Sequence, residues 1–192
     1  MSGPGARQEI EIKLRLDDAA TGRRLLRQAG FRVSRRRAHE DNLLFDTPER
    51  ALRSQGVLLR LRRSGPHSTL TFKGPAAVGK HKSRLELETT VANASTLQDI
   101  LILLRFAPVF RYEKYRTEYR CKYYRVLATL DETPIGVFIE LEGKPRWIDR
   151  TARRLGFGEV SYITDSYAGL YQASRKPREG EAWAMGFPPV RV

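Results

Sequence analysis

Charged and apolar side chains alternate with a period of two along seven separate segments of this chain. In the first of them, Glu9, Glu11 and Lys13 share one face of an extended backbone, and apolar residues occupy the other. One such strand is typical of a solvated sheet surface, but seven that mix acids and bases indicate a shared polar interior. The segments are 9–14, 57–63, 69–74, 83–89, 112–122, 125–132 and 136–143, with a shorter eighth at 40–46.

Helices are predicted between these segments, each with a recognisable start or stop signal. Ser95 is the expected N-cap of a helix at 95–106, and Pro145 is placed to begin one at 145–155. Two more amphipathic helices are predicted at 17–29 and 164–174, with a short helical turn at 48–55.

Four amphipathic helices need an apolar surface on which to pack. If they cover the outer, apolar face of a curved sheet, the charged faces of the strands become enclosed. The short connections between most of the strands favour an antiparallel arrangement. We therefore predict an α+β fold, an eight-stranded antiparallel β-barrel that forms a charged tunnel with helices packed outside.

The sequence predicts a single tunnel domain at 8–175, which lies between a flexible N-terminus at 1–7 and an irregular C-terminal tail at 176–192. Its one cysteine, Cys121, excludes an internal disulfide and a cysteine-based zinc site. No apolar run approaches the roughly 20 residues needed to span a bilayer, and the start lacks the apolar stretch of a signal peptide. These features predict a cytoplasmic protein without a membrane partner, and they leave the oligomeric state open.

Pairs of glutamates two residues apart occur on three of the predicted strands. Such pairs point the same way, so their carboxylates can share a divalent cation, and Mg²⁺ or Mn²⁺ prefers oxygen ligands. One pair alone is better explained as exposed glutamates neutralised by lysine, but three pairs in a basic chain favour a metal site. The pairs are Glu9 with Glu11, Glu86 with Glu88, and Glu140 with Glu142.

Basic residues interleave with these acids on the same strand faces. The chain has 35 Lys and Arg against 22 Asp and Glu, a net charge of +13, which predicts an anionic partner. Guanidinium and ammonium groups suit the spread charge of a linear triphosphate. A nucleic-acid surface is the alternative, but the interleaved glutamates and Asp131 would repel a nucleic-acid backbone, so nucleic acid is not an expected partner. The cations are Arg60, Arg62, Lys73, Arg84, Lys114 and Arg116.

The ordered succession of these motifs resembles the CYTH superfamily, the triphosphate tunnel metalloenzymes, over about residues 8–172. That family includes class IV adenylate cyclases, thiamine triphosphatases and inorganic tripolyphosphatases. The resemblance implies an eight-stranded tunnel in which glutamates hold Mg²⁺ or Mn²⁺ and basic residues bind the triphosphate. The motifs are EIEIK at 9–13, LFDTPERALRSQGVLLRLR at 44–62, LTFKGP at 70–75, SRLELE at 83–88, EKYRTEY at 113–119 and GVFIELEG at 136–143.

The resemblance also assigns roles, position by position. The catalytic set it implies is Glu9, Glu11, Glu140, Glu142 and Asp131. The implied metal ligands are Glu9, Glu11, Glu86, Glu88, Glu140 and Glu142. The implied substrate ligands are Lys13, Arg60, Arg62, Lys73, Arg84, Lys114 and Arg116. Asn42 departs from the pattern, because many relatives carry an acid there, and no basic residue from a C-terminal helix can be matched.

Three other sequence features say less about function. One segment, GPAAVGKH at 74–81, closely matches the pattern of a phosphate-binding P-loop. However, His81 replaces the Ser or Thr that binds magnesium, and a strand is predicted after the segment where a P-loop requires a helix. We interpret it as a flexible hairpin loop and expect His39, His67 and His81 to be exposed. The arginine cluster RVSRRR at 32–37 is expected to be a solvated connection between a helix and a strand.

The leading functional hypothesis is divalent-metal-dependent hydrolysis of a triphosphate, either tripolyphosphate or a nucleoside triphosphate, by an enzyme. A class IV adenylate cyclase, which converts ATP to cyclic AMP and pyrophosphate, would use the same phosphate clamp. A non-enzymatic polyphosphate or RNA binding module would need the cations but not the glutamates. Neither fold nor motifs decide between the two enzymes.

Overall fold

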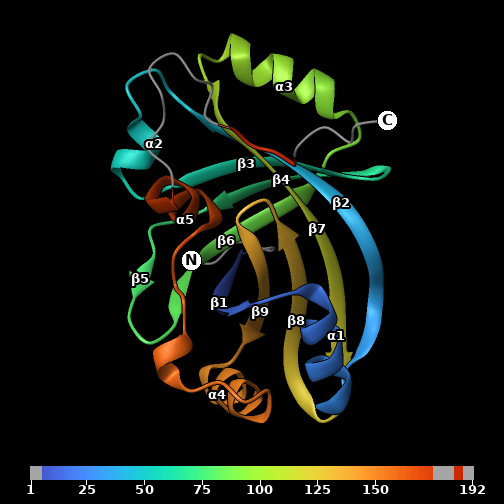
Figure 1. Ribbon diagram of the computed structural model, residues 1–192. Helices are drawn as coiled ribbons and strands as arrows, with labels where there is room; N and C mark the ends of the chain where they lie inside the picture. Colours follow the sequence, from blue (N-terminus) through green and yellow to red (C-terminus); the bar gives the residue numbers. More distant parts are fainter. Residues whose placement is uncertain (1–5, 175–183, 188–192) are drawn as a thin grey trace.

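Eight long antiparallel strands form a closed barrel in the computed structural model, which describes residues 6–174 and 184–187. Around the ring the order is β1, β9, β8, β7, β2, β3, β4, β6, and pairing of β6 with β1 closes it (Figure 1). The strands are β1 (Ala6–Leu16), β2 (Arg32–Asp46), β3 (Leu58–Ser64), β4 (His67–Lys73), β6 (Lys82–Thr90), β7 (Ala107–Cys121), β8 (Tyr124–Thr133) and β9 (Gly136–Gly143). The predicted α+β barrel is confirmed.

Helices pack on parts of the outer surface. The cluster around Leu26, Ile148 and Ala152 joins α1 (Ala19–Gln28) and α4 (Pro145–Arg154) to the outward side chains of β1, β8 and β9. A second cluster, around Phe45, Leu61 and Leu101, places α3 (Ala94–Leu103) on β2 and β3 at the opposite end of the barrel (Figure 1). The remaining helices are α2 (Ala51–Ser54), α5 (Tyr167–Ser174) and the short 3₁₀ helix Glu159–Ser161.

The helix starts agree with the sequence in two cases and differ in one. Pro145 is the first residue of α4, and Asp18 caps α1 by accepting a hydrogen bond from the Thr21 amide at 2.7 Å. The cap of α3 is Asn93, whose side chain accepts from the Thr96 amide, and not Ser95 as predicted. Ser and Asn are both common at the N-cap, so the sequence alone could not decide between Asn93 and Ser95.

The RVSRRR cluster was expected to be a connection, and that expectation is wrong. Residues 32–40 form the first half of β2 and pair with β7. The segment does not alternate in hydrophobicity because its side chains are mostly exposed, so hydrogen bonds to β7 define it as a strand. The β3 register begins only at Asp41, which leaves the outer edge of residues 32–40 without a named strand partner in the described chain.

Helices do not cover every outer strand face. Leu85 and Leu87 on β6 remain 42% and 38% exposed, although the barrel prediction placed them under helices. Two short strands attach to strands of the barrel: β5 (Ala77–Val78) pairs with β6, and β10 (Ala184–Met185) pairs with β7. β10 lies within the predicted irregular tail at 176–192, most of which is outside the described residues, as are residues 1–5 of the predicted flexible N-terminus. No helix of the described chain has the length and apolar character needed to cross a membrane.

Candidate functional site

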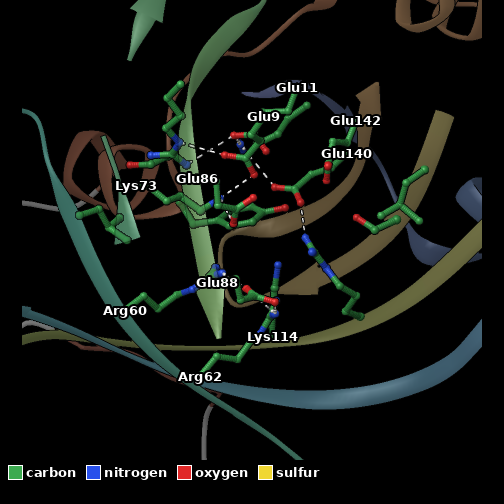
Figure 2. Close-up of a pocket in the computed structure, with 18 of the residues that line it drawn as sticks. Glu9, Glu11, Arg60, Arg62, Lys73, Glu86, Glu88, Lys114, Glu140 and Glu142 are labelled. Carbon is green, nitrogen blue, oxygen red and sulfur yellow. Dashed lines mark hydrogen bonds and ion pairs between the residues drawn. The ribbon is translucent and has the colours of Figure 1, made fainter. Parts of the chain in front are cut away.

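A cavity of about 260 Å³ runs inside the barrel and is lined by the charged strand faces (Figure 2). Period-two alternation explains the lining, because alternate residues of each strand point to the barrel interior. The predicted site residues that line the cavity are Glu9, Glu11, Lys13, Arg60, Arg62, Lys73, Arg84, Glu86, Glu88, Lys114, Arg116, Glu140 and Glu142. Asp131 is the one predicted site residue that does not line it.

Carboxylates gather on three neighbouring strands, β6, β1 and β9. The register sets Glu11 opposite Glu142 and Lys13 opposite Glu140. In Figure 2 the Glu9, Glu11, Glu140 and Glu142 side chains lie on one side of the cavity. We call Glu9, Glu11, Glu86, Glu140 and Glu142 the acidic wall.

Most members of the acidic wall are held by a neighbouring cation. Glu9 lies 2.6 Å from the Lys73 Nζ and 3.0 Å from the Arg84 Nε. Glu86 lies 3.2 Å from the same Lys73 Nζ. Burial acts to raise the pKa of Glu9 and of Glu86, but Lys73 outweighs it and lowers both pKa values, so the carboxylates are ionised.

Glu142 differs from its neighbours. Among the described residues its one partner within ion-pair distance is Arg7, 3.2 Å away, whose side chain is 56% exposed. Burial, reinforced by the nearby carboxylates of Glu9 and Glu86, raises the pKa of Glu142 above its usual value. Glu142 is therefore the member of the acidic wall whose negative charge is least stabilised, and an added cation beside it would relieve the repulsion.

The donor set fits a hard divalent cation. Every member of the acidic wall offers carboxylate oxygens, which Mg²⁺ and Mn²⁺ prefer, and the excess charge at Glu142 favours a cation there. Within residues 6–174 and 184–187, no cluster of three or more His, Cys, Asp or Glu is arranged to hold a metal by itself. A cation bound here would therefore need phosphate oxygens or water to complete its ligand shell.

Cations dominate the other side of the cavity. Arg60 and Arg62 on β3 and Lys114 on β7 lie across from the acidic wall in Figure 2. Arg62 pairs with Glu88 at 3.2 Å and with Glu40 at 3.7 Å. Burial and the neighbouring Arg60 nevertheless lower the pKa of Arg62 from its usual value. We call Arg60, Arg62, Lys114 and Arg116 the basic wall; the lowered pKa of Arg62 indicates that its positive charge is not fully offset there, which favours an anion.

Lys82 is a further buried cation whose charge is poorly offset, and it was not among the site residues predicted from the sequence. Its side chain is buried, and its nearest carboxylate is Glu11, 3.9 Å away. Burial, together with repulsion from Arg84 and Lys13, lowers the pKa of Lys82 to about 8. Lys82 shares the strand face of Arg84 and Glu86, so its alternation on β6 was the signal that could have found it.

Raising the pH from 7 to 9 is expected to weaken tripolyphosphate binding by metal-free protein about tenfold, because a group with a pKa near 8 changes from mostly protonated to mostly neutral over that range. Lys82 is charged below pH 8 and neutral above it, and only the charged form attracts phosphate. Calorimetric titration in EDTA measures the effect. In the Lys82→Arg variant the guanidinium stays charged, so only the titration of tripolyphosphate itself should remain. The same pH dependence in both proteins would exclude Lys82 from the anion site.

Asp131 is fully buried and organises the basic wall from behind. It accepts hydrogen bonds from Lys114 at 2.8 Å, from the Arg116 Nε at 2.7 Å and from the Tyr167 hydroxyl at 2.9 Å. Arg116 also pairs with Glu140, so this network links the basic and acidic walls. We propose a positioning role for Asp131, for which the resemblance implied a catalytic one, because its oxygens are occupied by Lys114, Arg116 and Tyr167 and it does not line the cavity.

Tyr167 at the start of α5 brings an aromatic group into the charged interior. Its ring lies 5.3 Å from the Lys13 ammonium and 5.1 Å from that of Lys114, and it packs edge-on against Phe138. Burial raises the pKa of Tyr167 well above its usual value, so the hydroxyl is a donor to Asp131. No sequence pattern predicts this contact, because α5 begins more than thirty residues after the end of β8.

Two further charged residues were missed. Glu40 on β2 is buried 3.6 Å from Lys114; burial acts to raise its pKa, but Lys114, Arg116 and Arg62 lower it to about 2. It lies two residues before Asn42, the position that lacks the family's acid. Arg7 lies near the start of β1, within the segment predicted to be a flexible N-terminus. Its guanidinium donates a hydrogen bond to Glu86 at 2.6 Å.

His81 is half-buried and not exposed as predicted. Its Nε2 lies 2.8 Å from Asp149 on α4, which also pairs with Lys80 at 2.9 Å. These contacts tie the 74–81 connection to α4, so it is held to the barrel at this point. His39 and His67 are exposed, in agreement with the prediction.

A second cavity, of about 500 Å³, adjoins the first. The two share Leu44, Leu58 and Arg84, and the second is bounded by Val57 and Phe110. Its walls are more apolar than those of the charged cavity, so it could receive an organic group attached to a bound phosphate chain.

Comparison with known proteins agrees with this geometry. A family model described as the CYTH domain matches residues 7–167. A protein of Methanocaldococcus jannaschii, provisionally named an adenylate cyclase, is 30% identical over 135 residues, which cover 70% of this chain and 75% of that protein.

Solved structures share the fold. A Pyrococcus horikoshii protein superimposes with a TM-score of 0.72 at 26% identity, over 87% of this chain and 99% of that one. A Hippeastrum protein first assigned as an adenylyl cyclase, and described as having a dominant triphosphatase activity, superimposes with a TM-score of 0.64 at 21% identity, over 88% and 97% of the two chains.

Proposed function

Because this chain belongs to the CYTH domain family, we propose that it is a divalent-metal-dependent triphosphatase that hydrolyses tripolyphosphate or a nucleoside triphosphate inside its barrel. One observation carries the proposal: the charged form is disfavoured at Glu142, which lies beside other carboxylates, and also at Arg62 in the same cavity and at Lys82 in the adjoining cavity, which lie beside other cations. A bound metal–triphosphate complex supplies both missing charges at once. A metal-free polyanion would relieve only the basic wall.

Each wall has a separate task in this reaction. Arg60, Arg62 and Lys82 bind the phosphate chain through charge-assisted hydrogen bonds. Lys114 and Arg116, held in place by Asp131, neutralise charge that develops on the phosphate oxygens as the bond to the leaving group breaks. The acidic wall would hold Mg²⁺ or Mn²⁺, which supplies further charge neutralisation when bound.

Glutamates of the acidic wall can also orient the attacking water. Glu142 suits this role because its raised pKa places it closer to the working range of a general base than its ionised neighbours. Water attack at a terminal phosphorus requires no contact to an organic group. Hydrolysis can therefore proceed with tripolyphosphate and, since the adjoining apolar cavity has room, with nucleoside triphosphates.

Adenylate cyclase activity is the second candidate, favoured by the provisional name of the Methanocaldococcus relative. Cyclisation needs the ribose 3′-oxygen aligned with the α-phosphorus, so the base must be held rigidly. In the adjoining cavity the amide side chain is Gln172, whose oxygen accepts from Arg53. That oxygen is therefore already engaged and does not hold an adenine amino group, which supports hydrolysis. The dominant triphosphatase activity of the Hippeastrum protein points the same way.

A product analysis tests the choice. Pure protein is incubated with ATP or tripolyphosphate in Mg²⁺ or Mn²⁺, and phosphate, pyrophosphate and cyclic AMP are separated and quantified. We expect phosphate release from both substrates to exceed cyclic AMP formation, with no turnover in EDTA. If ATP gave mainly cyclic AMP and pyrophosphate while tripolyphosphate stayed intact, the cyclase would replace the triphosphatase. Binding without any product would support the non-enzymatic module.

A further inference from the structure

The positive charge of this protein lies mostly outside its cavity. The lining contains nine Lys and Arg against seven Glu, an excess of two. The chain as a whole carries +13. Triphosphate binding in the barrel therefore leaves most of the positive charge without a role, and its placement on the surface indicates a second anionic partner.

Helix α4 exposes a row of arginines. Arg146, Arg150 and Arg153 are exposed at spacings of four and three, which places them on one side of the helix, while Ile148 and Ala152 face the core. None of these three guanidiniums is within ion-pair distance of a carboxylate in the described chain. They are therefore free to bind an external anion.

Helix α1 continues this surface. Arg23, Arg24 and Arg27 are exposed, and they too have no carboxylate within ion-pair distance among the described residues. Both helices pack on β1, β8 and β9, and both lie at the same end of the barrel (Figure 1).

The turn between β7 and β8 joins the two helices. Lys122 and Arg125 are exposed in and beside this turn. The Arg150 guanidinium on α4 lies 5.8 Å from the Tyr124 ring, which in turn stacks at 6.0 Å on Phe31, three residues after α1. The exposed cations of α1, α4 and this turn thus lie on neighbouring elements at one end of the barrel, and we call them the basic face.

We propose that the basic face binds nucleic acid through its phosphate backbone, without sequence preference. Most of its cations are arginines, whose forked donors match phosphate oxygens. The tip of the β7–β8 turn also exposes Tyr123, 68% accessible, beside Lys122, and an aromatic ring next to a cation suits contact with bases or sugars. The sequence argument against nucleic acid rested on glutamates interleaved with cations, whereas the cations of the basic face have no carboxylate within ion-pair distance among the described residues.

An anionic membrane surface is the other polyanion that arginines could meet, and the distribution of apolar groups disfavours it. Peripheral membrane helices expose apolar side chains beside their cations. On α4 the apolar side chains are buried, and the exposed Ile100, Leu103 and Leu104 belong to α3 and its end, at the opposite end of the barrel (Figure 1). The run of exposed leucine and isoleucine side chains therefore lies away from the cations of the basic face, so the basic face fits a hydrated phosphate backbone better than a membrane surface.

Fluorescence anisotropy with a labelled 24-base-pair DNA duplex tests the proposal over a series of salt concentrations. The Arg150→Gln/Arg153→Gln double variant should reduce the slope of log affinity against log salt by about 2, and weaken binding in 0.1 M salt more than tenfold, because each lost phosphate contact removes about 0.9 from the slope. The Arg23→Gln/Arg27→Gln double variant should reduce the salt slope and the affinity by similar amounts. Arg50→Gln/Arg105→Gln is the matched control, since both arginines are exposed away from the basic face.

Three outcomes would overturn the proposal: no duplex binding at low salt, equal loss in the control variant, or binding only to phosphatidylglycerol vesicles. Displacement of the duplex by one equivalent of tripolyphosphate would also do so, because it would place the duplex in the barrel. The basic face variants should keep full triphosphatase activity, so failure of this proposal and failure of the proposed function are measured separately.

Discussion

Turnover of tripolyphosphate by the Glu142→Gln variant is expected to fall about 100-fold in saturating Mg²⁺, the size of effect typical for loss of a group that supports a metal site. Burial and neighbouring carboxylates already disfavour the charged form of Glu142 in the folded protein, so a neutral amide of the same shape should fit without loss of stability. Glu9→Gln is a less clean test, because it would leave the buried Lys73 and Arg84 without their shared partner.

Phosphate release as a function of Mg²⁺ concentration, together with thermal unfolding, measures this effect. Glu132→Gln is the matched control: Glu132 lies on the neighbouring strand β8 and pairs with the exposed Arg37 outside the cavity. The control should keep wild-type turnover. Unchanged activity and metal dependence in Glu142→Gln would remove this glutamate from the metal site and weaken the role of the acidic wall.

Replacing Asp131 by alanine is expected to reduce the free energy of unfolding by about 3–5 kcal/mol, the usual cost of leaving buried charges without a partner. The substitution would leave Lys114, Arg116 and the Tyr167 hydroxyl without their common acceptor. Urea denaturation measures the loss. Asp41→Ala is the control, because its partner Arg111 is 52% exposed, and surface pairs contribute about 0–1 kcal/mol.

Ligand rescue separates the positioning role of Asp131 from a catalytic one. Tripolyphosphate should stabilise Asp131→Ala more than wild type, because the freed Lys114 and Arg116 would bind its oxygens. A variant that folds with wild-type stability but loses turnover would return Asp131 to the catalytic set, as the family resemblance had implied.

The barrel and the inward direction of its charges could be predicted from the sequence because both follow from a local rule. Alternate residues of a strand point to opposite faces, whatever lies elsewhere in the chain. Glu9, Arg60, Glu86 and Glu140 were therefore assigned to the interior correctly. Lys82 followed the same rule and was missed only because it borders a loop.

The rule fails where backbone pairing, not the side-chain pattern, makes the strand. The arginines at 32–37 do not alternate with apolar residues, yet hydrogen bonds to β7 make them part of β2. These bonds join residues some eighty positions apart. A single-sequence pattern carries no information about such a partner.

Tertiary structure alone decided which charge meets which. Lys73 bridges Glu9 and Glu86, Asp131 is enclosed by Tyr167 from α5, and Glu142 is left with one exposed cation. These contacts join segments far apart in sequence and depend on barrel curvature and strand register. The sequence by itself therefore determined the sign and the direction of the buried charges, and the fold determined their balance, because Coulomb energies depend on distances that only the closed barrel sets.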